Sequence, residues 1–286
     1  MLALNADLHC HSTVSDGTLS PEQLAQRAKD NGVALWALTD HDEVAGQHRA
    51  AAAARAAGLD YLAGVEISVS FAGQTVHIVG LGIDPDDAAL CNGLADTRNG
   101  RHRRARAIGD SLATAGIDGA LEGALALAGN PEMVTRTHFA RWLVATGVCR
   151  DTHDVFRRYL VRGTPGYVAQ QWATLRDAVG WIVGAGGIAV IAHPGRYKVS
   201  ANEESALFDE FKSHGGRAVE VQTASHSDAE VAKYGTLAQR HGLLASRGSD
   251  FHSPGESRVE LGALPAMPGG LTSVWSELQS RIARAA

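Results

Sequence analysis

The sequence contains only three cysteines, Cys10, Cys91 and Cys149, and no CxxC pair. An odd number of widely spaced thiols excludes the usual framework of a disulfide-rich secreted domain and of a zinc ribbon. The chain also lacks an apolar run near the roughly 18 residues of a membrane span. Its first residues reach histidine and aspartate too early for the apolar core of a signal peptide. We therefore expect a cytoplasmic protein that is not bound to a membrane.

A strong charge of one sign is also missing. The 286 residues include 26 Lys and Arg against 31 Asp and Glu, which gives a net charge of -5. This balance argues against a surface built to coat nucleic acid. The 32 glycines follow no fixed repeat period, so a solenoid is excluded. Hydrophobic residues make up 45% of the chain, enough for one large core or two ordinary domains.

Short apolar runs rich in β-branched residues recur along the chain and end in polar residues, as buried strands do. A helical pattern at 20–31 follows the first run, with Ser20 at the N-cap, Pro21 in the first turn and Asn31 near the end. Alternation of strands and helices predicts an α/β fold with a mostly parallel sheet or barrel. The expected strands lie at 2–7, 33–40, 61–66, 76–80, 187–193, 218–221 and 243–248.

The alternation stops after residue 84, where about 80 residues show helical periodicity and no convincing strand. We interpret 85–166 as an inserted helical domain, with 1–84 and 167–286 forming the main α/β domain. The insertion holds eleven arginines, no lysine and nine acids, so it is the electropositive part of an acidic chain. Solvated helix faces account for some of these arginines, but the cluster at 98–106 is too dense for that explanation alone.

Histidines and carboxylates recur near the carboxyl ends of the expected strands. In parallel α/β folds this edge holds the active site. A single histidine there is usually a structural residue, whereas nine such side chains at one rim are best satisfied together by divalent cations. The candidate ligands are His9, His11, Asp16, His41, Glu66, His77, His193, Asp250 and His252.

Nine ligands exceed the coordination capacity of one ion, so we expect two or three divalent ions with a bridging carboxylate. Imidazole and carboxylate ligands without thiolate favour manganese, iron or zinc over calcium or copper. Manganese is the expected ion, with zinc, iron and magnesium as alternatives.

The motifs that carry these residues resemble the PHP (polymerase and histidinol phosphatase) family. They are Asp-Leu-His-Cys-His-Ser at 7–12, Thr-Asp-His at 39–41, Gly-Val-Glu at 64–66, Ala-His-Pro at 192–194 and Gly-Ser-Asp-Phe-His at 248–252. The resemblance implies a distorted, amidohydrolase-like (β/α)7 barrel whose trinuclear metal site hydrolyses phosphoesters.

The same resemblance implies how the ligands are shared among three ions. One ion would be held by His9, His11, Glu66 and Asp250, a second by Glu66, His77 and His193, and a third by Asp16, His41 and His252. It also implies direct catalytic roles for Asp16, His193 and Asp250. The general acid stays unassigned, because an imidazole that binds a metal is a poor proton donor.

Within this family, the arginine-rich insertion is similar to that of small bacterial members that act on nucleotides. The resemblance implies a metal-dependent phosphatase that removes the 3′-phosphate of nucleoside 3′,5′-bisphosphates and leaves a 5′-mononucleotide. One alternative is a 5′-3′ exoribonuclease on short RNA. A histidinol-phosphate-type phosphatase is a second alternative, which a cationic lid suits poorly. A polymerase-accessory module with purely structural metals is a third, and the acidic net charge argues against it.

The expected partner is therefore a nucleotide or short oligonucleotide, and no stable protein partner is implied. Arginines of the insertion, which we call the lid, would hold the unreacted phosphate in a bidentate manner. Tyr167 and Trp172 are candidates for stacking on a base, although core packing is the more common role of such residues. The predicted substrate contacts are Ser12, Arg101, His102, Arg103, Arg104, Thr135, Arg136 and Arg247.

Overall fold

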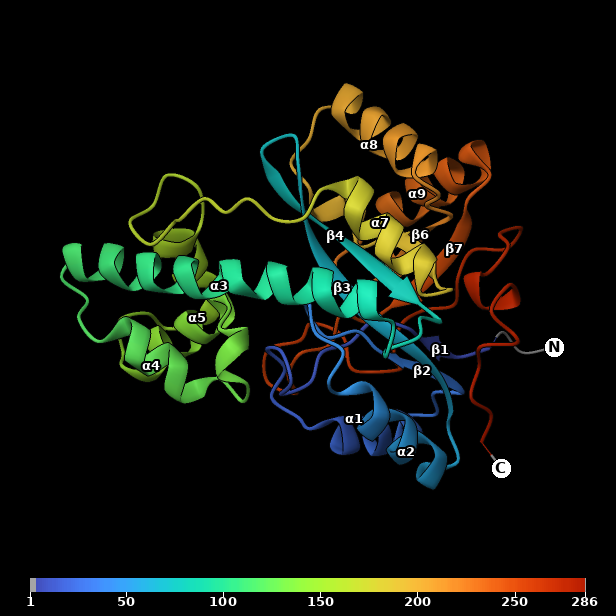
Figure 1. Cartoon of the computed structure of the whole chain (residues 1–286), viewed down its shortest axis with the longest axis horizontal. Helices are drawn as coiled ribbons and strands as arrows, with labels where there is room; N and C mark the ends of the chain where they lie inside the picture. Colours follow the sequence, from blue (N-terminus) through green and yellow to red (C-terminus); the bar gives the residue numbers. More distant parts are fainter. Residues whose placement is uncertain (1–3, 286) are drawn as a thin grey trace.

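The computed structural model describes residues 4–285, and its centre is a seven-stranded sheet whose strands neighbour one another in sequence order (Figure 1). The Leu8 N–H donates to the Arg247 carbonyl at 3.1 Å, so the first and last strands approach and nearly close a barrel. All seven predicted strands are present, although residues 2 and 3 of the first lie outside the described residues. The strands are β1 (Ala6–Asp7), β2 (Leu35–Leu38), β3 (Asp60–Phe71), β4 (Gln74–Leu81), β5 (Ile188–Ile191), β6 (Ala218–Thr223) and β7 (Leu244–Gly248).

The sheet is mostly parallel, as predicted, but β4 runs antiparallel to both of its neighbours. Only Ala72 and Gly73 separate β3 from β4, so no helix intervenes, and both residues adopt positive φ angles of 46° and 72°. A tight hairpin of this kind reverses the chain without a crossover. Both strands extend further than the sequence pattern indicates, and they carry Glu66 and His77 to the same rim.

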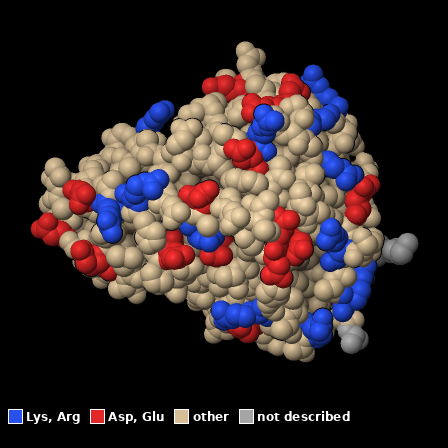
Figure 2. Space-filling model, viewed as in Figure 1, with Lys and Arg blue, Asp and Glu red and all other residues tan. Residues whose placement is uncertain are grey.

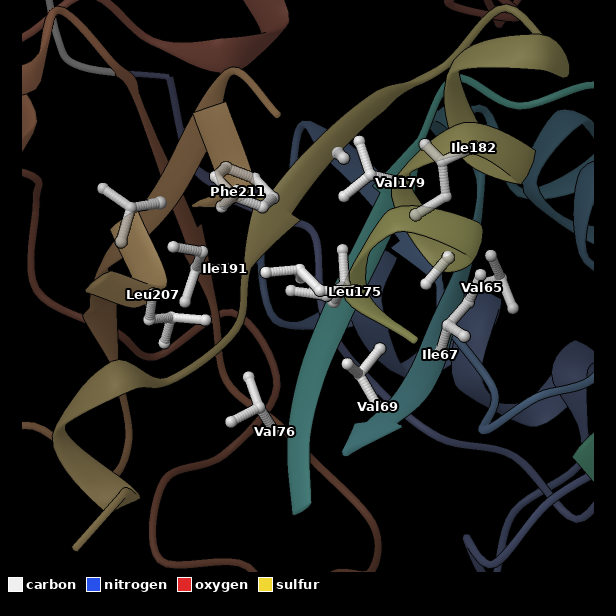
Figure 3. Close-up of a cluster of buried hydrophobic side chains, with 14 of the residues drawn as sticks. Val65, Ile67, Val69, Val76, Leu175, Val179, Ile182, Ile191, Leu207 and Phe211 are labelled. Atoms are coloured by element: carbon white, nitrogen blue, oxygen red, sulfur yellow. The ribbon is translucent and has the colours of Figure 1, made fainter. Parts of the chain in front are cut away.

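Helices cover the outside of the barrel and seal its core. Figure 3 shows Val65, Ile67 and Val69 of β3 on the side of α7, whereas Leu207 and Phe211 of α8 lie near Ile191 of β5. All of these residues belong to one buried cluster. The predicted helix after the first strand begins at Ser20, whose side chain accepts from the Gln23 N–H in a capping box. The barrel helices are α1 (Pro21–Asp30), α2 (Gln47–Ala57), α7 (Leu175–Gly184), α8 (Ala201–Ser213) and α9 (Asp228–His241).

Between β4 and α7 the chain forms a helical lid that projects from one side of the barrel (Figure 1). The lid has its own apolar cluster, which includes Leu112, Phe139 and Leu160. Its first helix also reaches the barrel, because Gly93 approaches Trp181 of α7 so closely that a Cβ would lie 2.3 Å from the indole. The lid helices are α3 (Ala88–Thr114), α4 (Ala120–Leu127), α5 (Arg136–Ala145) and α6 (Thr152–Val155).

Four shorter helical turns complete the described elements: η1 (Pro131–Met133), η2 (Phe156–Leu160), η3 (Pro194–Arg196) and η4 (Val274–Ser276). Among the helices of residues 4–285, none has the length and apolar character needed to cross a membrane. On the face shown in Figure 2, acidic and basic side chains are interspersed, in agreement with the modest net charge.

Candidate metal centre

All nine predicted ligands lie at one end of the barrel. Most follow the carboxyl ends of parallel strands, whereas Glu66 and His77 lie within the β3–β4 hairpin. Their ligand atoms form four overlapping groups in which every atom lies within 4.8 Å of the others. The groups are His11 with Asp16, His41 and His252; His9 with Glu66 and His193; His9 with His11 and Asp250; and His41 with Glu66 and His77.

Glu66 is the centre of the arrangement. Its Oε1 lies 2.8 Å from His77 Nδ1 and 3.0 Å from His193 Nε2. The other oxygen, Oε2, lies 2.8 Å from His41 Nδ1 and 3.3 Å from His11 Nε2. The carboxylate therefore contacts histidines of all three predicted ion sites, which is the geometry of a bridging ligand.

Two further carboxylates complete the set. Asp250 Oδ1 lies 3.2 Å from His11 Nε2 and 3.6 Å from His9 Nε2. Asp16 Oδ1 lies 3.4 Å from His252 Nε2 and 3.8 Å from His41 Nε2. Ligand atoms that share one ion at about 2.0–2.2 Å lie roughly 3 Å from one another, so these separations fit coordination.

Within residues 4–285, three buried ligand atoms form no hydrogen bond of acceptable geometry: Asp16 Oδ1, Glu66 Oε2 and His41 Nδ1. The last two nevertheless lie only 2.8 Å apart. Buried polar atoms are normally hydrogen-bonded, and a site that binds an ion is one reason for an exception. The donor set is imidazole and carboxylate throughout. These residues therefore fit a centre of divalent cations.

The protonation states of His11, His77 and Glu66 suit metal binding. Burial lowers the pKa of His11 to about 3 and that of His77 to about 4, so both rings are neutral at neutral pH. Burial alone would raise the pKa of Glu66, but His77, His41 and His9 lower it well below its usual range. Neutral imidazoles and ionised carboxylates are the forms that bind cations.

Strained backbone occurs at the same rim. Among residues 4–285, four non-glycine residues have positive φ, and two of them are ligands: His193 at 28° and Asp250 at 54°. A third, Asp42 at 46°, directly follows the ligand His41. Such conformations persist only where the surroundings fix them, and they cluster at functional sites. The strain at His193 and Asp250 directs two ligands toward Glu66 and His11.

Glu220 on β6 contacts two of the predicted ligands, and the sequence pattern did not identify it. Its Oε1 lies 2.8 Å from His9 Nδ1, and its Oε2 accepts the His193 N–H at 2.7 Å. Both contacts are made by atoms that face away from the metal groups. Glu220 therefore orients two ligands and belongs to none of the four groups that could hold an ion.

We expect Glu220→Gln to lower metal affinity and phosphoesterase activity by about 10- to 100-fold, the usual effect of removing a carboxylate that orients a ligating histidine. The amide preserves the side-chain volume but removes the charge beside His9. Metal titration and steady-state kinetics on the same preparation measure both effects. Unchanged metal affinity would show that His9 does not need this carboxylate.

Gly248 permits close contact between β7 and the segment that carries His9. A Cβ on Gly248 would lie 2.2 Å from His9 Cβ and 2.7 Å from the His9 backbone nitrogen. We therefore predict that Gly248→Ala displaces His9, lowers metal content and costs about 2–3 kcal/mol of unfolding free energy. Gly180→Ala is the matched control, because its Cβ would meet no atom within 4 Å in α7, and it should stabilise the helix slightly. Equal behaviour of the two variants in thermal unfolding would contradict the prediction.

A pocket extends from the metal centre to the lid. Arg101, Arg104 and Arg136 line it together with the ligands Asp16, His41 and His252. The Arg101 guanidinium already has partners within the protein, because it donates to Asp42 Oδ2 and to Ser68 Oγ. The structure thus brings three of the predicted lid arginines to the metal pocket.

Trp172 forms one wall of this pocket and holds the arginines in place. The guanidinium groups of Arg101 and Arg104 lie 4.8 and 5.3 Å from its ring centroid. Its indole N–H donates to Thr75 Oγ1 at 3.0 Å, and the side chain is buried. Trp172 therefore packs and stacks on arginine, whereas Tyr167 is not among the residues that line the pocket.

Thr135 connects the lid to a ligand. Its hydroxyl donates to Asp16 Oδ2 at 3.0 Å at the start of α5. Arg141 on the same helix donates to the Asp16 carbonyl at 2.7 Å. The first turns of α5 therefore fix the loop that presents Asp16 to the centre.

The remaining predicted substrate contacts lie elsewhere. Ser12 donates from its hydroxyl to Asp40 Oδ2, and Arg247 is buried and donates to the Leu264 carbonyl. His102 and Arg103 are exposed on α3, and none of these four residues lines the metal pocket. Arg196, which the sequence pattern did not identify, does line it and donates to Asp250 Oδ2 at 2.6 Å. The only sequence signal for Arg196 is its place three residues after His193.

Comparison with known proteins agrees with this geometry. A profile of the PHP domain matches residues 7–224. A 3′,5′-nucleoside bisphosphate phosphatase of Chromobacterium violaceum is 52% identical, and the alignment covers 99% of each chain. The 5′-3′ exoribonuclease Rnm of Escherichia coli is 44% identical, with 94% of this chain and 92% of that protein covered.

Solved structures give the same result. The structure of an amidohydrolase from Chromobacterium violaceum, with bound sulfate and no metal, superposes with a TM-score of 0.96 at 52% identity and covers 99% of this chain and 98% of that chain. A Bifidobacterium adolescentis protein named for metal-dependent phosphoesterase activity superposes with a TM-score of 0.81 at 29% identity, with 96% of each chain covered. The predicted barrel class is thereby confirmed.

Proposed function

The chain belongs to the PHP domain family, and we propose that it is a metal-dependent phosphatase that removes the 3′-phosphate from nucleoside 3′,5′-bisphosphates. The observation that carries this proposal is the position of Arg104 and Arg136 in the same pocket as the metal ligands. A substrate with two phosphates can place one at the centre and the other at the lid. The name and 52% identity of the Chromobacterium violaceum relative support the same substrate.

The nine residues at the rim would hold two or three divalent ions, and we propose manganese as the principal one because the ligands are imidazole and carboxylate. When bound, such ions polarise phosphoryl oxygens and lower the pKa of water. Among the described residues, Glu66 is best placed to be shared between ions, since it contacts histidines of all three predicted ion sites.

Arg104 and Arg136 are the proposed anchors of the second phosphate. Their hydrogen bonds go to the backbone carbonyls of Val168 and Leu160, and neither has a carboxylate partner within residues 4–285. Burial, together with Arg136 and Arg101, lowers the pKa of Arg104 to about 9. Positive charges that are packed together without counter-ions favour the binding of a phosphate dianion. In this proposal residues 85–166 act as a substrate-binding lid on the main domain.

During hydrolysis the chain would hold the substrate by both ends. Binding energy at the remote phosphate then helps to align the reacting phosphate with the centre. Arg196 lies at the boundary of the pocket, where its guanidinium can contact a phosphoryl oxygen while remaining near Asp250. Asp16, His193 and Asp250 remain the predicted catalytic residues.

The cellular location is a separate proposal. Cys10, Cys91 and Cys149 are all free thiols. Free thiols are typical of a reducing compartment, so they support the cytoplasmic location expected from the sequence.

The proposed activity is tested by a phosphate-release screen with manganese, magnesium and zinc in parallel. We expect rapid release from 3′,5′-bisphosphates and slower release from 3′- or 5′-monophosphates. A chelator should abolish release, and the metal should restore it. Equal rates for bisphosphates and monophosphates would contradict the role assigned to the lid.

A further inference from the structure

The hydrogen bonding between β4 and β5 is irregular where the two strands reach the rim. The strands are antiparallel and pair Ile78 with Ile191, so the next pair in this register is His77 with Ala192. The Ala192 N–H donates to the His77 carbonyl at 3.1 Å, which is half of a regular hydrogen-bonded pair. In a regular ladder the His77 N–H would donate back to the Ala192 carbonyl. Here it donates instead to the phenolic oxygen of Tyr197, at 2.8 Å.

The Tyr197 hydroxyl completes this pair as a bridge. It accepts from the His77 N–H and donates to the Ala192 carbonyl at 2.8 Å, so one side-chain oxygen replaces one direct bond between the strands. A path of two hydrogen bonds is longer than a single one. The hydroxyl therefore sets the separation of β4 and β5 at this pair.

Both chain segments carry a predicted ligand of the same ion at this point. His77 is itself a ligand, and His193 directly follows Ala192. Their ring nitrogens lie 2.8 and 3.0 Å from Oε1 of Glu66. The Tyr197 ring also packs in a T-shaped arrangement against the His193 ring, with the centroids 5.7 Å apart. A change in the separation of the two strands would therefore move one imidazole relative to the other.

The segment that carries Tyr197 is fixed on both sides. On one side the Lys198 N–H donates to Gln74 Oε1 at 3.1 Å, and the Gln74 amide donates to the Lys198 carbonyl. On the other side the Gly195 N–H donates to His226 Nε2 at 3.0 Å. Tyr197 itself is half-buried and is not among the residues that line the metal pocket. Its place in the structure is that of a spacer between strands, and it is not a substrate contact.

We propose that Tyr197 is a positioning residue whose hydroxyl sets the geometry of His77 and His193, and so determines how tightly these histidines and Glu66 hold their ion. The inference rests on the proposed metal-dependent function. It does not require Tyr197 to touch an ion or the substrate. A group that orients metal ligands typically changes metal affinity by about 10- to 100-fold when it is removed. Of the nine predicted ligands, Tyr197 contacts His77 and His193, so the loss should fall on one ion.

The test is Tyr197→Phe, which removes the hydroxyl and keeps the ring. Titration of the metal-free protein with manganese alone should show about tenfold weaker binding of one ion and unchanged binding of the others. The rise in the thermal unfolding midpoint that manganese causes should be smaller for the same reason. Tyr234→Phe is the matched control, because it removes the hydroxyl of a buried tyrosine that donates to Glu204 Oε1 at 2.9 Å, outside the ligand groups. This control should bind manganese as the wild-type protein does.

Phosphate release from a nucleoside 3′,5′-bisphosphate gives a second measurement. At limiting manganese the rate of Tyr197→Phe should fall in proportion to the lost ion. Excess manganese should restore most of kcat, with KM for the bisphosphate unchanged. A purely structural role would lower the unfolding midpoint of both metal-free variants and leave their manganese binding equal.

Equal manganese affinity in Tyr197→Phe and the wild-type protein would overturn the inference, and so would an equal weakening of every ion. A wild-type protein that binds manganese but releases no phosphate from bisphosphates would contradict the proposed function alone. The manganese titration would still decide the role of Tyr197 in that case. A wild-type protein that binds no manganese would overturn both proposals.

Discussion

Glu66→Gln is expected to lower metal-dependent phosphate release by about a thousandfold or more, although the substitution hardly changes the volume of the side chain. Both oxygens of Glu66 contact imidazoles, and those imidazoles belong to every part of the predicted centre. The amide has no negative charge and only one acceptor oxygen, so it cannot bridge two cations. Several kcal/mol of charge stabilisation depend on the ions, and each 1.4 kcal/mol corresponds to about a factor of ten.

The measurement combines phosphate release with metal content determined on the purified protein. We expect the variant to retain fewer ions and to recover little activity at high manganese concentration. Glu204→Gln is the control, because its carboxylate pairs with Lys233 and the Tyr234 hydroxyl and belongs to none of the ligand groups. A Glu66→Gln protein that keeps its full metal content and a tenth of its activity would refute the bridging role.

The metal ligands could be predicted because their positions depend on a short-range pattern. Most ligands lie in or shortly after an apolar run that forms a strand, and parallel strands deliver their carboxyl ends to one edge. His9 and His11, two positions apart in extended chain, necessarily point to the same side. The order of the strands is therefore enough to predict that these nine residues, which are distributed over most of the sequence, lie close together.

Glu220 and Arg196 could not be predicted in the same way. In the sequence, Glu220 is one of several polar residues that alternate with apolar residues in β6. Only the folded structure shows that it contacts His9 and His193. Arg196 reaches the pocket through the turn η3, which follows the positive φ of His193. Neither a register nor a turn of this kind has a residue pattern that a single sequence reveals.

The sequence predicts that arginines of the lid bind a phosphate. Which of them reach the pocket depends on the packing of α3 against the barrel. Arg101 faces inward and bonds to the strained Asp42, whereas Arg103 lies two positions further along the helix and is exposed. Arg104, one turn from Arg101, shares its face and therefore reaches the pocket. Helical periodicity separates these residues only when the orientation of the helix is known.

Arg136→Ala is expected to lower kcat/KM for a nucleoside 3′,5′-bisphosphate by about 100-fold, while the rate on a 3′-mononucleotide changes little. A charged hydrogen bond to phosphate contributes about 1.5–3 kcal/mol, which corresponds to roughly 10- to 100-fold. Arg136 is placed for such a contact because its guanidinium pairs with no carboxylate in the described part of the chain and borders the metal pocket. The 3′-mononucleotide lacks the phosphate that the arginine would bind, so it cannot lose this interaction.

The ratio of the two rates is the informative quantity, since a merely destabilised lid would slow both substrates equally. Arg104→Ala should give the same change in ratio, because the two guanidiniums face one pocket. Arg106→Ala, on the same helix as Arg104 but exposed and outside the pocket, is the matched control and should leave the ratio unchanged. If Arg136→Ala reduced both rates by the same factor, the arginine would support the lid rather than the second phosphate, and the preference for bisphosphates would need another source.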